Sequence, residues 1–369
     1  MDYQMPKYEV GITDINVVVR RLGYISAILR LLEHKTLSES VLYTRLERWS
    51  LNHKQNLKDY ANEQGFIKAT RGQTASKRYT NFVVSMGLIG RIAGACRVTR
   101  FGKPLLPFLR RIPSQNPFEL TDAERCAYLY WLLLKDGDQL LTVIRMLVEK
   151  HSRSLSGLQN AFPTFYLQQL KDRMLTAEEH VAPEILAVRN RVAHWGEGTG
   201  RSIENIVPPR LHWLADLGLV AVENDGKRQA RLTEMGIQFS QSLPKIQGTL
   251  TFHTSSVWLR QQFFGMAGQV LVGKIDRQWT EIHNSERREL LHKLTFQAFE
   301  TLRSTPAPQI SLYPALIYMA LLLMKDNGIA VNLEELHADL DAFSKEPDPR
   351  YTVRFSHREN ESYLIFFPT

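Results

Sequence analysis

The chain has 369 residues, of which 44% are hydrophobic and 23% are charged. This is the ordinary composition of a globular protein, so it excludes wholesale disorder, a collagen-like repeat and a coiled-coil rod. Two cysteines are too few for a disulfide framework or for a cysteine-only zinc site. The longest apolar runs, 126–134 and 314–324, are shorter than the roughly 20 residues that a transmembrane helix needs. Since the N-terminus also lacks the pattern of a signal peptide, we expect a cytoplasmic protein without a membrane partner.

Positive charge is concentrated in one segment. The whole chain carries 46 basic and 38 acidic residues, a formal net charge of +8. Segment 64–118 contains no Asp or Glu and carries +10, so the remainder of the chain carries −2. Its cations are Lys68, Arg71, Lys77, Arg78, Arg91, Arg97, Arg100, Lys103, Arg110 and Arg111. Soluble surfaces usually intermingle both signs of charge, so this segment predicts a surface that binds phosphates.

The chain begins with a helical pattern. Apolar residues recur at helical spacing over 15–33, which predicts a first helix. Ser38 is a typical N-cap for a second helix that runs through Trp49, and a third short helix is predicted over 54–63.

Residues 74–86 have the clearest amphipathic pattern in the chain. Apolar residues fall on one helical face, and Thr74, Lys77, Arg78, Asn81 and Ser85 fall on the opposite face. Gly87 is placed to end this helix, and two short apolar runs around Gly94 predict a β-hairpin. The segment is therefore expected to form a helix with a polar outer face followed by a small hairpin.

The same ending occurs twice in the sequence. Residues 82–102 and residues 211–236 both contain a helix that ends in Gly-Leu and a hairpin that ends in Thr-x-x-Gly. In both copies, the threonine is placed to cap the next helix. The second hairpin is longer and contains Asp225 and Gly226, a favoured tight-turn pair. Internal similarity of this kind predicts two copies of one module.

Both copies resemble the recognition helix and wing of winged helix-turn-helix domains. This resemblance implies a mainly α fold with small β-hairpin wings, in which two winged-helix modules are joined by a helical segment. We expect an N-terminal basic module at 1–112, a helical linker at 113–178, a second module at 179–248, and a C-terminal helical domain with a terminal hairpin at 249–369.

Further helices are predicted between the two copies and after the second. They cover 121–134, 138–150, 165–175, 254–264, 285–303, 314–325 and 333–344. The last 20 residues predict a hairpin whose strands are joined by the polar residues 357–361. The C-terminal region is therefore a candidate for a third, degraded winged module.

The resemblance implies a set of DNA-binding residues in the first module. Arginine and asparagine side chains can bond guanine and adenine in the major groove, and wing cations can bind phosphates. The candidates are Lys68, Arg71, Thr74, Lys77, Arg78, Asn81, Arg91, Arg97, Arg100 and Lys103. The second module has few cations, and only Lys227, Arg228 and Arg231 on its wing are expected to touch phosphates.

One short motif suggests chemistry. Arg189, Asn190 and His194 resemble the R-N-x-x-x-H motif of HEPN ribonucleases, which implies metal-independent RNA cleavage with Arg189 and His194 as the catalytic residues. Asn190 and His194 are four residues apart and would share one helical face. The alternative is an ordinary helix of the second module that presents these residues to solvent.

Two other patterns do not predict a cofactor or a metal. Residues 268–274 match part of a phosphate-binding loop, but Ile275 replaces the Ser or Thr that binds magnesium, and the segment has the pattern of a strand. The acidic run 334–341 has helical spacing and is interpreted as the polar face of an amphipathic helix.

These observations lead to one main hypothesis and two alternatives. We expect a non-enzymatic subunit that binds double-stranded DNA through its first module and a protein partner, or a second copy of itself, through the rest. By analogy alone, its size fits a prokaryotic defence or mobile-element system. RNA offers the same phosphates as DNA, so the cations do not distinguish the two. The alternatives are the HEPN-like ribonuclease and an assembly scaffold that binds an acidic partner.

Overall fold

The computed structural model describes residues 9–11, 18–53, 67–110, 116–150, 152–177, 179, 181–195, 205–223, 229–273, 275–303, 307–347, 349–359 and 361–367. In this part of the chain the fold is mainly helical with small sheets, which confirms the predicted fold class at this level. The helix predicted at 54–63 and the predicted phosphate contacts Lys227 and Arg228 lie outside the described residues.

Unit 1 is the N-terminal helical unit with its own three-stranded sheet. Its elements are α1 (Gly23–Leu31), β1 (Leu37–Ser38), α2 (Glu39–Asn52), α3 (Thr74–Ser85), β2 (Ile89–Ile92) and β3 (Ala95–Val98). The sheet order is β1-β3-β2 with antiparallel neighbours, so the short first strand pairs with the last strand of the hairpin. The helix predicted at 74–86 and the hairpin around Gly94 are both confirmed, and Gly87 has the positive φ of 75° expected after a helix.

Unit 2 repeats this order of elements with the additional helix α6. It contains α4 (Asp122–Lys150), β4 (Ser152–Ser154), α5 (Leu155–Arg173), α6 (Ala182–Ala193), α8 (Val207–Asp216), β5 (Val220–Glu223) and β6 (Gln229–Leu232). Its sheet order is β4-β6-β5, again with the first strand paired to the last strand of the hairpin. Segment 113–178, expected as a linker, supplies α4, β4 and α5 to this unit. Elements on the two sides of the expected boundary at residue 178 are in contact, because β4 pairs with β6.

Unit 3 has the same order at the C-terminal end, with a π-helical turn and a short strand inserted before its third helix. It contains α12 (Asn284–Leu302), β8 (Gln309–Ser311), α13 (Leu312–Leu322), the π-helical turn η3 (Leu323–Asn327), β9 (Ile329–Ala330), α14 (Leu333–Phe343), β10 (Tyr351–Ser356) and β11 (Glu361–Phe366). The sheet order is β8-β11-β10 with antiparallel neighbours. The terminal hairpin is confirmed. The region expected as a candidate third copy therefore shares the topology of the other two.

Short elements join the three units. They are η1 (Lys103–Phe108), α9 (Glu234–Ser242), α10 (Ser256–Gln261), α11 (Phe263–Leu271), β7 (Arg277–Gln278) and η2 (Trp279–Glu281). Strand β7 pairs in parallel with β9 of unit 3. Residues 268–271, predicted as part of a strand, instead complete α11. A short apolar run has the same composition in a buried strand and a buried helix, so its periodicity does not distinguish them.

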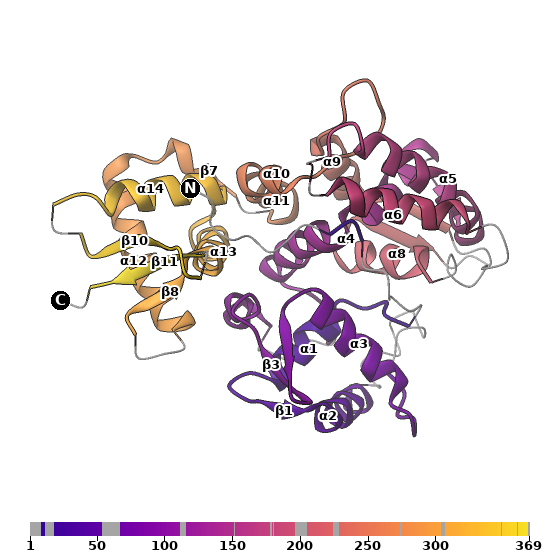
Figure 1. Ribbon diagram of the computed structural model, residues 1–369, viewed down its shortest axis with the longest axis horizontal. Helices are drawn as coiled ribbons and strands as arrows, with labels where there is room; N and C mark the ends of the chain where they lie inside the picture. Colours follow the sequence, from indigo (N-terminus) through magenta and orange to yellow (C-terminus); the bar gives the residue numbers. More distant parts are fainter. Residues whose placement is uncertain are drawn as a thin grey trace.

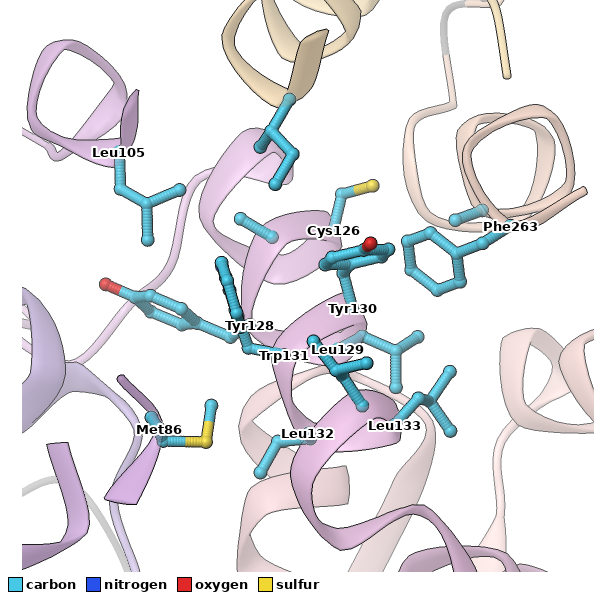
Figure 2. Close-up of a cluster of buried hydrophobic side chains, with 14 of the residues drawn as sticks. Met86, Leu105, Cys126, Tyr128, Leu129, Tyr130, Trp131, Leu132, Leu133 and Phe263 are labelled. Carbon is cyan, nitrogen blue, oxygen red and sulfur yellow. The ribbon is translucent and has the colours of Figure 1, made fainter. Parts of the chain in front are cut away.

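Helix α4 lies at the centre of the molecule (Figure 1). Unit 1, in indigo and purple, lies below α4 in this view, unit 2 lies to the right, and unit 3, in orange and yellow, lies to the left. The residues of α4 from Cys126 to Leu134 are all buried. Their side chains point outward on several sides of the helix, toward Met86 of unit 1, Leu105 of η1 and Phe263 of α11 (Figure 2). One helix therefore supplies core residues to several parts of the fold.

The repeated Gly-Leu and Thr-x-x-Gly residues form the same junction in units 1 and 2. The hydroxyl of Thr99 donates to the carbonyl of Gly87 and accepts from the amide of Gly102. Thr233 makes the same two bonds with Gly218 and Gly236. A Cβ atom at Gly102 would lie 2.2 Å from the carbonyl oxygen of Leu88, and one at Gly236 would lie 2.0 Å from that of Leu219. The second glycine is thus required by close backbone approach.

Buried ion pairs hold unit 2 together and attach it to unit 1. The pairs are Arg210–Asp136 at 2.6 Å, Arg173–Asp138 at 3.1 Å and Arg21–Asp216 at 2.8 Å. Arg210 and Asp136 are fully buried and make two parallel bonds, and the backbone of α4 leaves helical geometry at Asp136. A buried carboxylate needs such partners because its desolvation is otherwise very costly.

His253 is expected to make the stability of the protein depend on pH. Burial, with a smaller effect of the adjacent Arg173, lowers the pKa of His253 to about 4 from its ordinary value of 6.5. Arg173 donates a hydrogen bond to Nε2 of this ring, which favours the neutral form. Because the unfolded chain binds this proton more tightly, the free energy of unfolding should fall as the pH decreases from about 6.5 to about 4. Urea denaturation at pH 7, 5 and 4 should show a smaller decrease in His253→Gln than in the wild type; equal decreases would contradict this prediction.

Candidate nucleic-acid interface

Helix α3 of unit 1 presents a polar face to solvent. Its apolar face is buried, and the hydroxyl of Tyr79 accepts bonds from the amides of Arg20 and Arg21. On the opposite face, Thr74, Lys77 and Asn81 are exposed and Arg78 is half-buried. Lys68 and Arg71, on the segment that enters the helix, are exposed as well. The structure therefore gathers six of the predicted residues around one face of α3.

Most of these cations are free of acidic partners in the part of the chain that the structure describes. Within those residues, no ion pair forms at the basic side chains of Lys68, Arg71, Lys77, Arg78 and Arg97. The N-cap of α3, Gln73, makes no side-chain capping bond, so the positive end of the helix dipole adds to the same surface. These charges are available to an anion from solution.

Two cations on α2 extend this surface and were missed in the sequence. Arg45 and Arg48 are exposed and form no ion pair with a described residue. The amide side chain of Gln73 donates to the hydroxyl of Thr44, which brings α2 against the start of α3. Both arginines lie outside the acid-free segment 64–118, so the charge pattern gave no signal for them. Only the packing of α2 on α3 places them here.

The hairpin cations differ in their surroundings. Arg97 is exposed. The pKa of Lys103 is lowered by the partial burial of its own side chain and, to a smaller extent, by the nearby charge of Arg97. Arg91 donates to the side-chain oxygen of Asn81 and lies 3.5 Å from a carboxylate oxygen of Glu39.

Arg100 differs from the cations around α3 because it has an acidic partner. It was expected beside phosphates on the wing, but its guanidinium pairs with the buried carboxylate of Glu361 at the start of β11. The guanidinium carbon of Arg100 lies over the ring of Phe101, 4.9 Å from the ring centroid. Arg100 therefore joins units 1 and 3 and does not belong to the free cationic surface.

The equivalent helix of unit 2, α8, is packed inside unit 2 and also contacts unit 1. Seven of its ten residues are buried. Asp216 accepts a bond from the amide of Leu22, and the indole of Trp213 donates to the carbonyl of Val19 at 2.9 Å. The ring of Trp213 stacks on Phe82 of α3, with centroids 4.8 Å apart. Helix α8 therefore packs against the buried face of α3.

The equivalent helix of unit 3, α14, has an acidic outer face. Leu333, Leu336, Leu340 and Phe343 are buried, and the remaining positions include Glu334, Glu335, Asp339 and Asp341. Asp339 bonds Arg287 at 2.8 Å and Asp341 bonds Lys345 at 2.6 Å. An acidic face repels phosphates. Of the three equivalent helices, only α3 presents a cationic face to solvent.

The remaining wing candidate is partly neutralised. Arg231 of unit 2 is exposed but pairs with Glu223 on the neighbouring strand at 2.6 Å. Lys227 and Arg228 fall outside the described residues, so the structure gathers no cluster of free cations on this hairpin within the described part.

The residues of the HEPN-like motif lie at the end of α6. Arg189, Asn190 and His194 are exposed, while Ile185 and Val192 on the other face of the helix are buried. The Nδ1 atom of His194 bonds the carbonyl of Asn190 at 2.7 Å. The structure therefore places the three residues on a solvated surface, where they have the surroundings of an ordinary outer helix.

Within the described residues, no three His, Cys, Asp or Glu side chains form a group that could hold a metal ion, and no helix is long and apolar enough to cross a membrane. Comparison with protein-family models, with curated proteins and with solved structures finds no match to this chain. The surface around α3 is accordingly the feature from which a function can be inferred.

Proposed function

We propose that this protein is a non-enzymatic DNA-binding subunit that contacts duplex DNA through unit 1. The observation that carries the proposal is the free cationic face of α3, flanked by Lys68 and Arg71 and by Arg45 and Arg48 of α2. Phosphate contacts supply much of the affinity of proteins for DNA. Unpaired cations beside a helix N-terminus form a surface that can bind such phosphates.

The topology of unit 1 supports the same proposal. The order helix, strand, helix, helix, hairpin, with the first strand paired to the last, is the arrangement expected of a winged helix-turn-helix domain. In helix-turn-helix proteins the second helix of the motif enters the major groove. Helix α3 occupies that position and carries Thr74, Lys77 and Arg78 on its first turns.

Units 2 and 3 would then have supporting roles. Helix α8 packs against unit 1 and α14 is acidic, so neither offers a second duplex-binding face. We propose that units 2 and 3 hold unit 1 in place and leave their outer surfaces for a protein partner or a second copy of the chain.

The proposal predicts a steep dependence of duplex binding on salt. Each phosphate contact adds roughly 0.9 to the slope of log affinity against log salt. Lys77→Ala/Arg78→Ala should lower that slope by roughly 1.8 and weaken binding at every salt concentration. Fluorescence anisotropy of a labelled duplex between low and physiological salt measures both quantities.

A matched control removes the same charge elsewhere. Arg189→Ala/Arg191→Ala also removes two exposed cations, from α6 of unit 2, and should leave the slope unchanged. Equal effects of the two double variants would show that net charge alone drives binding, and absent binding by the wild type would overturn the proposal. The same variant also tests the ribonuclease alternative. That alternative requires the wild type to cleave RNA and the Arg189 variant to lose this activity.

A further inference from the structure

Arg91 is held between two helices of unit 1. It lies on β2, its Nη2 atom donates to Oδ1 of Asn81 on α3, and its Nε atom lies 3.5 Å from Glu39 at the start of α2. Glu39 in turn accepts a bond from the hydroxyl of Tyr43. About a third of the Arg91 side chain remains exposed, at 32%. Asn81 and Glu39 therefore fix the orientation of the guanidinium, and part of this group is still accessible to solvent.

This contact changes what Asn81 can do. An asparagine that reads adenine uses both its carbonyl oxygen as acceptor and its amide as donor. The oxygen of Asn81 is already the acceptor for Arg91. Asn81 is the eighth of the 12 residues of α3, so Arg91 of the hairpin reaches the C-terminal half of the polar face of this helix. The unpaired cations Lys77 and Arg78 lie on the N-terminal half.

We infer that Asn81 is a positioning residue for Arg91 and does not read a base. Arg91 has five N–H donors; Asn81 and Glu39 engage two and the thiol of Cys96 engages another, so the remaining donors can bind a phosphate beside α3. The duplex would be approached by the N-terminal half of α3 and by Arg91 at its edge. This inference rests on the proposed function and replaces the adenine contact that the sequence suggested for Asn81.

A double-mutant cycle in DNA binding tests the inference. Asn81→Ala, Arg91→Ala and the double variant are compared by duplex titration across salt, using a set of duplexes of equal length in which A·T and G·C pairs are exchanged. Arg91→Ala should lower the salt slope by roughly 0.9. Asn81→Ala should weaken binding to all duplexes by the same factor, and should have no further effect in the Arg91→Ala background, because it acts through Arg91.

The opposite pattern would overturn the inference. If Asn81 reads adenine, Asn81→Ala weakens binding selectively to duplexes rich in A·T pairs, and its effect adds to that of Arg91→Ala. A second cycle measures urea midpoints of the same three variants without DNA. Additive shifts of the midpoint would show that Asn81 does not hold Arg91. This second cycle separates the inference from the proposed function, since it gives an answer even if the wild type fails to bind duplex DNA.

Discussion

Replacing Asp136 by alanine is expected to lower the free energy of unfolding by about 3–5 kcal/mol. Asp136 and Arg210 are both fully buried, and two bonds of 2.7 and 2.6 Å join them. The substitution leaves a guanidinium in the interior without its counterion, and the desolvation of that charge is then uncompensated. Urea denaturation followed by far-UV circular dichroism measures the loss.

Two controls identify the cause of this loss. Glu223→Ala breaks the exposed pair with Arg231 and should cost less than about 1 kcal/mol, because surface ion pairs contribute little. Asp136→Leu/Arg210→Met removes both charges and should recover much of the stability lost by Asp136→Ala. A loss for Asp136→Ala as small as that for Glu223→Ala would contradict the role of the buried pair.

Trp213→Ala is expected to cost a similar amount, about 3–5 kcal/mol. The side chain is fully buried between units 1 and 2, where it stacks on Phe82 and donates to the carbonyl of Val19. Its loss leaves a cavity and an unpaired carbonyl behind α3. Chemical denaturation measures the total effect, and limited proteolysis should show earlier cleavage in unit 1.

Trp213→Phe is the matched variant for this prediction. Phenylalanine retains an aromatic ring against Phe82 and loses the indole N–H, so its cost should be well below that of the alanine variant. If Trp213→Ala and Trp213→Phe were equally and only slightly destabilised, the contact between α8 and α3 would not hold the two units together.

The local elements of unit 1 follow from the sequence because their determinants are local. The amphipathic spacing over 74–86 defines α3, and Gly87 adopts the positive φ that ends it. The segment 113–178, expected as a linker, contains a strand that only a long-range contact reveals. Strand β4 has three residues and pairs with β6, which lies over 70 residues further along the chain. A strand this short has no periodic signal of its own.

The candidate site was predictable as a set of charges, and its geometry was not. Composition shows where cations are concentrated, but it does not show which of them meet a carboxylate. Arg100 pairs with Glu361, which is 261 residues away in the sequence. Arg45 and Arg48 join the surface only because α2 packs against α3. The availability of a charge depends on tertiary packing, whereas its presence depends on sequence alone.

We expect duplex DNA to cover unit 1 and to leave the other units open. Lysine footprinting tests this directly, since an acylating reagent modifies exposed lysines and mass spectrometry measures each one. Lys68 and Lys77 are exposed in unit 1, and Lys293 and Lys325 are exposed in unit 3. A saturating duplex should protect Lys68 and Lys77 and leave Lys293 and Lys325 as reactive as before. Protection of the unit 3 lysines with Lys68 and Lys77 unchanged would contradict the account.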